Sequence, residues 1–231
     1  MSQEDQINNI FKLFYPPDDE LLKNSFLTIT FDHCIPIGMN CNSSSCLEES
    51  NNRNYKLPFD WMQAPISSYK RMLFDMKNKN INFEVQLKPK VMLKHYDALI
   101  PHEPSNDSNL IKLNYIKYFE RLNNILTFDG KNVKNICFVI TSFSWEAMQY
   151  KMIKEYKILL NELYPNNNYF FLTVNVGNTP FVTKDHINII NKRAEGFCIN
   201  GKWIGNIYNK PLFHFFSKYL SSTKIQYLSG S

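Results

Sequence analysis

The chain has 231 residues, of which 44% are hydrophobic and 15% aromatic, and its formal net charge is +5. This composition supplies a sizeable core and excludes an intrinsically disordered chain. The 26 basic residues are interleaved with 21 acidic ones rather than gathered in one block. We therefore interpret the charge as a solubilising surface, and nucleic-acid binding is not expected.

The first residues, MSQEDQ, are acidic and polar, unlike a secretory signal, and no apolar run approaches the roughly 18 residues that span a bilayer. The five cysteines form no CxxC pair and no Cys/His spacing typical of a zinc site. We expect a cytoplasmic protein (in the host cytoplasm if the chain is viral) with free thiols. No membrane association, metal or cofactor is expected.

The pattern predicts a polar lead-in over residues 1–24, one α/β domain over 25–225 and a flexible tail over 226–231. Strands are predicted over 26–31, 135–142 and 169–176, and helices from Pro65 onward and over 110–128, 146–164, 184–192 and 211–220. Short extended segments are expected around Pro89, and a hairpin over 196–207 around Asn200-Gly201. Apolar strands that alternate with amphipathic helices predict a mostly parallel central sheet flanked by helices.

One candidate for chemistry is Cys41, which follows a glycine turn at Gly38 after the first predicted strand. A thiol at a helix amino terminus meets the positive end of the helix dipole and unpaired N–H groups, which favour the thiolate and can form an oxyanion hole. The alternative is a small buried core residue, which spacing alone favours. Cys34 and Cys46 compete with it, but no glycine turn precedes either.

A second feature is the string Leu-Pro-Phe-Asp-Trp, which ends at Trp61 and places two aromatic residues around Asp60. Asp60 could orient a histidine or cap the helix after Cys41; alternatively, the string anchors its loop to the core. A cysteine nucleophile also needs a base, which can lie far away in sequence. His102, beside Glu103, is the first candidate. His95 is its alternative, whereas His186 is expected to cap the helix predicted over 184–192.

Five segments now stand in a distinctive order: IGMNC, PFDWMQAPI, HEP, YIKYFERLNNIL and ICFVIT. This order resembles a domain family described as papain-like cysteine peptidases, found in bacteria, protists and large DNA viruses. The resemblance covers residues 28–142, about half of the chain, and Pro-Phe-Asp-Trp is its most specific element. It departs from the family in the residues after the cysteine, which are Asn42 and three serines instead of a small apolar residue. Two prolines also flank the histidine, at positions 101 and 104.

The resemblance implies that Cys41 is the nucleophile, His102 the base and Asp60 an orienting or structural residue. Arg121 matches the family's arginine. Substrate binding is assigned to Gly38, Asn40, Trp61 and Arg121. The leading hypothesis is thus a thiol hydrolase that forms an acyl-enzyme on a protein or peptide substrate.

Two alternatives to this hypothesis stay open. One is an inactive protein-binding module of viral or protist origin, and the other is an esterase or transferase on a parallel sheet. A papain-like α+β fold would supply the histidine from an antiparallel sheet, whereas the strand and helix pattern favours the parallel α/β arrangement.

Overall fold

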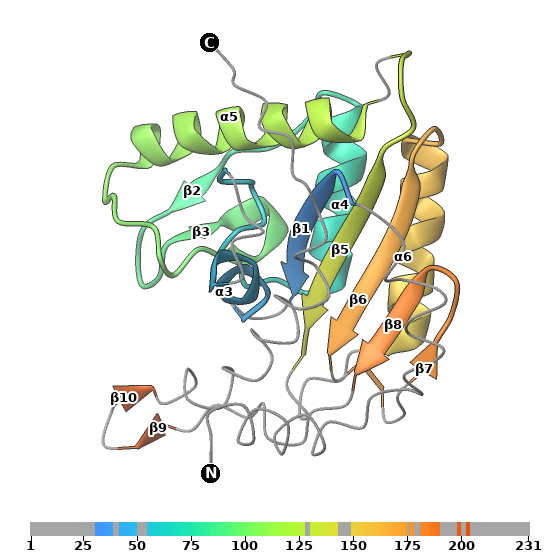
Figure 1. The fold of residues 1–231 in the computed structure, drawn as a ribbon. Helices are drawn as coiled ribbons and strands as arrows, with labels where there is room; N and C mark the ends of the chain where they lie inside the picture. The colour runs from blue at the N-terminus through green and yellow to red at the C-terminus, as the bar shows by residue number, and fades with distance from the viewer. Residues whose placement is uncertain are drawn as a thin grey trace.

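The computed structural model describes residues 31–38, 42–49, 55–127, 130–142, 149–174, 176–177, 181–189, 198–199 and 202–203, and the structural statements below concern these residues. Its main sheet has the strand order β1-β5-β6-β8-β7 (Figure 1). These strands are β1 (His33–Gly38), β5 (Asn135–Thr141), β6 (Asn168–Val174), β8 (His186–Ile189) and β7 (Phe181–Val182). The first four are parallel and β7 is antiparallel to β8. The predicted α/β class with a mostly parallel sheet is confirmed, rather than its papain-like alternative.

The central strands β5 and β6 are buried along almost their whole length. Their sequences, NICFVIT and NYFFLTV, are nearly continuous in apolar residues, which is typical of parallel strands covered on both faces. Phe138 of β5 stacks on Phe171 of β6, with ring centroids 5.7 Å apart, and Tyr156 packs edge-on against Phe138. Both strands therefore lie in the core, as their composition predicts.

Four helices accompany the sheet: α3 (Asn42–Glu49), α4 (Ile66–Lys77), α5 (Ser108–Leu126) and α6 (Tyr150–Leu163). In Figure 1, α4 and α6 stand behind the parallel strands, and α5 runs across the top of the view. The spacing of Ile66, Tyr69, Met72, Leu73 and Met76 puts all five on the buried side of α4, as predicted. Asp107 caps α5 by accepting bonds from Asn109 N and Leu110 N. Within the described ranges, no helix is both long and apolar enough to cross a membrane.

A small antiparallel sheet lies between α4 and α5 in sequence, where extended segments around Pro89 are predicted. It consists of β2 (Val85–Gln86), β3 (Met92–Leu93) and β4 (Ala98–Leu99), with the short helix η1 (Lys94–Tyr96) before β4. Gln63 and Leu99 exchange backbone hydrogen bonds of 2.9 Å in both directions. This bridge fastens the loop that contains Trp61 alongside the segment that leads to His102. Farther along, β9 (Cys198–Ile199) and β10 (Lys202–Trp203) form the predicted hairpin.

One strand is not predicted, and one predicted helix needs correction. The strand that leads to Gly38 is β1, at 33–38, which the sequence pattern does not predict, and the strand predicted over 26–31 lies outside the described residues apart from Phe31. Pro36 lies inside β1, which is the edge strand of the described sheet, where a residue without an N–H is tolerated. Residues 186–189 form a strand, not part of a helix over 184–192. The predictions for 1–24, 211–220 and 226–231 fall outside the described residues.

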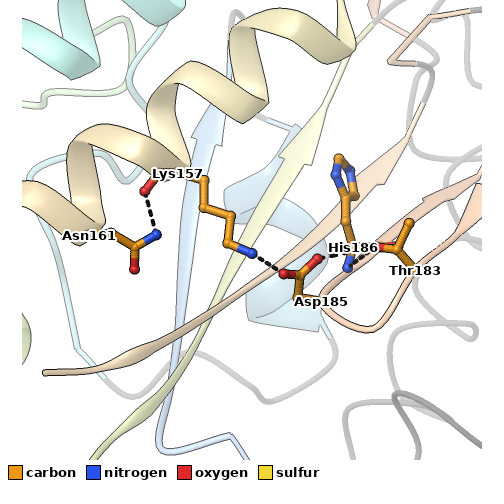
Figure 2. A network of polar contacts seen from close by, with 5 residues as sticks. All are labelled: Lys157, Asn161, Thr183, Asp185 and His186. Carbon is orange, nitrogen blue, oxygen red and sulfur yellow. Dashed lines mark hydrogen bonds and ion pairs between the residues drawn. The ribbon is translucent and has the colours of Figure 1, made fainter. Parts of the chain in front are cut away.

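Buried polar contacts explain why 186–189 can form a strand. His186 Nε2 lies 2.8 Å from Thr173 Oγ1 of β6, and Thr173 Oγ1 donates to Asn188 Oδ1 at 2.8 Å. Outside the strand, Lys157 of α6 forms an ion pair with Asp185 (Figure 2). Thr183 Oγ1 accepts a bond of 3.1 Å from His186 N. These partners satisfy the polar groups that β8 carries into the core.

This burial predicts a stability that depends on pH. The pKa of His186 is lowered from 6.5 to about 4, mainly by burial; Asp185 opposes this shift and Lys157 adds to it. The unfolded chain therefore binds this proton at a higher pH than the folded chain does. The stabilisation is complete above pH 6.5 and is lost as the pH falls toward 4, by up to about 3 kcal/mol.

Urea denaturation at a series of pH values from 7 to 4 measures this loss. In His186→Gln the free energy of unfolding should fall less steeply with decreasing pH. Part of the slope should remain in that variant, because burial also lowers the pKa of His33 to about 4. The exposed His95 offers the matched control, His95→Gln, which should keep the full slope. An unchanged slope in His186→Gln would contradict the prediction.

Candidate functional site

The candidate site lies where β1 ends at the carboxyl edge of the parallel strands. Gly38 is the last residue of β1, and α3 begins four residues later at Asn42. Ligands of open α/β sheets commonly bind at this edge. The predicted nucleophile Cys41, and Asn40 before it, lie outside the described residues, whereas both flanking elements are described.

The first turn of α3 is fastened to β1 and β5 by Ser43. Its hydroxyl donates to Ile37 O at 3.0 Å, accepts from Thr141 N at 3.0 Å and lies 3.0 Å from Thr141 Oγ1. Both Ser43 and Ser44 are buried. Ser43 and Ser44, two of the residues that depart from the family pattern, are thus small buried residues whose hydroxyls bind neighbouring elements.

The Pro-Phe-Asp-Trp string forms a tight turn anchored in the core. Phe59 is 1% exposed, and its ring packs edge-on against Tyr69 at 5.0 Å and Phe119 at 6.2 Å between centroids. Asp60 N donates to Leu57 O at 3.1 Å, and Asp60 Oδ2 accepts from Leu57 N at 2.9 Å. Asp60 therefore closes its own turn, and the string is the predicted aromatic anchor of its loop.

Trp61 joins the first turn of α3 to the predicted base. Its backbone has a φ of 57°, a left-handed conformation that is rare outside glycine. In this conformation Trp61 N donates to Ser44 Oγ at 2.9 Å. The Trp61 ring packs edge-on against the ring of His102, with centroids 4.9 Å apart. A single residue therefore contacts both α3 and His102.

His102 borders a small cleft of about 30 Å³, enough for one water-sized group. The cleft is lined by Lys56, Leu57, Asp60, Trp61, Ile100, His102, Glu103, Tyr115 and Tyr118. Burial raises the pKa of Tyr115, and the Glu103 carboxylate raises it further. The same two causes raise the pKa of Tyr118. Both phenols stay protonated at neutral pH and can donate hydrogen bonds to a group bound at the cleft.

Arg121 and His95 lie elsewhere. Arg121 Nη1 donates to Lys56 O at 2.7 Å, and the guanidinium lies over the ring of Tyr55 at 5.6 Å. These contacts hold the start of the loop that contains Asp60. The ring of His95 packs against Tyr96 in η1. The substrate-binding role of Arg121 stays a prediction, and of the two candidate bases it is His102 that borders the cleft with Asp60.

Tyr69 is a residue whose role sequence reasoning missed. Its helical spacing identifies it as a core residue, yet its hydroxyl donates to Gly38 O at 2.6 Å and lies 3.3 Å from Met62 O. It therefore ties the end of β1 to the loop after Trp61. A second signal was available in the sequence for how the start of α3 is held, namely the three consecutive serines after Cys41. Small hydroxyl residues at a helix start often bind nearby backbone groups.

Removing the Tyr69 hydroxyl should destabilise the protein. Tyr69→Phe leaves the buried carbonyl of Gly38 without its 2.6 Å donor, so we expect the free energy of unfolding to fall by about 1–3 kcal/mol. Tyr156→Phe is the matched control, because Tyr156 is equally buried and its hydroxyl has no hydrogen-bond partner among the described residues. The control should be neutral or stabilising. Equal losses in urea denaturation would show that the Gly38 bond contributes nothing specific.

Comparison of the chain with protein-family models, with curated proteins and with solved structures found no match. The resemblance to papain-like cysteine peptidases therefore stays a prediction.

Proposed function

We propose that the protein is a cysteine hydrolase in which Cys41 is the nucleophile and His102 is the general base. The observation that carries this proposal is the position of Trp61. It binds Ser44 in the first turn of α3 and packs against the ring of His102. Cys41 directly precedes α3 in sequence, and Trp61 links the first turn of this helix, through its backbone N–H, to the histidine, through its ring.

The local architecture also supports a reactive thiol. Thiols beside a helix amino terminus at the end of a parallel strand are favoured as thiolates, because the helix dipole and unpaired N–H groups stabilise the negative charge. The Ser43 bonds to Ile37 and Thr141 hold the start of α3 against the sheet. A rigid helix start of this kind preorganises N–H donors for a developing oxyanion.

The proposed reaction proceeds through an acyl-enzyme. The Cys41 thiolate attacks the substrate carbonyl carbon, and the tetrahedral intermediate expels the leaving amine or alcohol, which takes a proton from the His102 imidazolium. A thioester remains. His102 then removes a proton from water, which attacks the thioester, releases the acid and restores the thiol. In this scheme Asp60 shapes the turn that presents Trp61.

The surrounding surface favours an extended substrate such as a peptide. The cleft at His102 admits only a water-sized group, so a substrate would lie across its mouth. A larger groove of about 360 Å³ is lined by residues of the neighbouring segments, among them Gln63, Pro65, Met92 and Leu99. Grooves of this volume match the side chains or small groups that protein pockets bind.

The test is the reactivity of each cysteine toward iodoacetamide, followed by mass spectrometry of the peptides at neutral pH. We expect Cys41 to be alkylated first. Cys137 is the internal reference, because burial raises its pKa and keeps it as the neutral thiol. If Cys41 reacts no faster than Cys137 in the folded protein, the proposal fails. A screen of fluorogenic peptide amides, isopeptides and esters then identifies the substrate class, with Cys41→Ala as the inactive reference.

A further inference from the structure

Two cysteines outside the candidate site lie side by side on adjacent strands of the main sheet. Cys34 of β1 and Cys137 of β5 are direct partners in the parallel register. Both are free thiols and both are buried, with exposures of 8% and 0%. Neighbouring strands lie about 4.8 Å apart, and side chains at paired positions point to the same face of the sheet. The two sulfurs are therefore neighbours, although about a hundred residues separate them in sequence.

The neighbouring Cys34 thiol also affects the pKa of Cys137. Burial is the main cause that raises the pKa of Cys137, and a hydrogen bond with the Cys34 thiol raises it further. Paired strand positions meet the Cα separation of about 4.4–6.8 Å that a disulfide requires. The Cβ atoms of adjacent parallel strands are somewhat farther apart than in a relaxed disulfide, so a bond here requires a small approach of the two strands.

We propose that Cys34 and Cys137 form a redox-active dithiol that peroxide converts into a disulfide between β1 and β5. The inference is independent of the function proposed for Cys41. Cys34, the more exposed thiol, attacks hydrogen peroxide, breaks the O–O bond and becomes a sulfenic acid as one water leaves. The Cys137 sulfur then attacks the sulfenic sulfur and expels the second water. Two thiols and one peroxide thus yield one disulfide and two waters, so atoms and electrons balance.

A disulfide at this position should be reduced easily. Disulfides that depart from relaxed geometry are reduced more readily than relaxed ones. Burial and a raised pKa make Cys137 a poor target for direct oxidation, which suits a resolving thiol better than a first target. The bond would join the two strands that hold Ser43, through Ile37 of β1 and Thr141 of β5.

The experiment uses the full chain and hydrogen peroxide. The native protein is treated with peroxide, remaining thiols are alkylated in denaturant, and digestion without reductant is followed by mass spectrometry. We expect a linked peptide pair containing Cys34 and Cys137, lighter by two hydrogen atoms and released by dithiothreitol. Cys34→Ala and Cys137→Ala should each abolish this pair, whereas Cys198→Ala should retain it.

Oxidation of the chain in denaturant is a second reference. Loop closure there favours neighbours in sequence, such as Cys41 with Cys46, over two residues a hundred apart. Enrichment of the Cys34–Cys137 pair in the native sample therefore reports the strand register. The proposal is overturned if both thiols remain alkylatable after peroxide treatment of the native protein. Links from Cys34 to another cysteine, or oxidation of Cys34 to a sulfinic acid without any link, would also overturn it.

Discussion

Replacing His102 by alanine is expected to slow hydrolysis of the best substrate by about 10²- to 10⁴-fold, the usual contribution of a general acid–base residue. The variant should fold normally, because His102 is exposed and its ring contacts Trp61 at the edge of the protein core rather than within it. The rate of Cys41 alkylation should fall as well. Without an imidazolium partner the thiolate loses stabilisation, so its pH profile moves toward the ordinary cysteine pKa near about 8.5.

His95→Ala is the matched control for this experiment. His95 is also exposed, and its ring contacts Tyr96 rather than the cleft. We expect its kcat/KM and its alkylation profile to equal those of the unmodified chain. If both variants retain full hydrolysis, His102 is not the base. If His95→Ala alone is impaired, the roles of the two histidines are exchanged. Far-UV circular dichroism of both variants separates a catalytic loss from a loss of folding.

Phe59→Ala is expected to have the largest effect on stability, with a loss of about 3–5 kcal/mol in the free energy of unfolding. Phe59 is 1% exposed and fills the space between Tyr69 and Phe119, so truncation removes buried contacts and leaves a cavity. The same change frees the turn that contains Asp60 and Trp61. Urea denaturation monitored by circular dichroism gives the stability, and alkylation of Cys41 reports the effect on the site.

Phe74→Ala provides the comparison, because Phe74 lies on α4 with 53% of its surface exposed. Its loss should stay within about 0.5 kcal/mol. Phe59→Leu, which keeps most of the buried volume, should be milder than Phe59→Ala. A loss below about 1 kcal/mol for Phe59→Ala would mean that the string does not anchor its loop, whatever the chemistry of the site.

Much of the fold could be predicted because local patterns agree with the tertiary structure. The apolar runs of β5 and β6 are hydrophobic enough to be buried in any arrangement. The spacing in α4 leaves one face that can be buried. Strand β1 is not predicted because His33 and Pro36 interrupt its apolar pattern, and its strand character depends on pairing with β5. Residues 186–189 were assigned to a helix because the partner of His186, Thr173, comes from another strand.

The candidate site also has features that the sequence predicts and features that only the tertiary structure shows. The sequence by itself determined the order of Gly38, Asp60 and His102. It offered the aromatic anchor at Phe59 as one of two interpretations and favoured a parallel sheet, because residue type and periodicity carry those properties. Only the tertiary structure decided that Trp61 binds Ser44 and packs on His102, and that Tyr69 holds Gly38. These contacts join residues distant in sequence, largely through backbone N–H and C=O groups, which every residue carries and no pattern reveals.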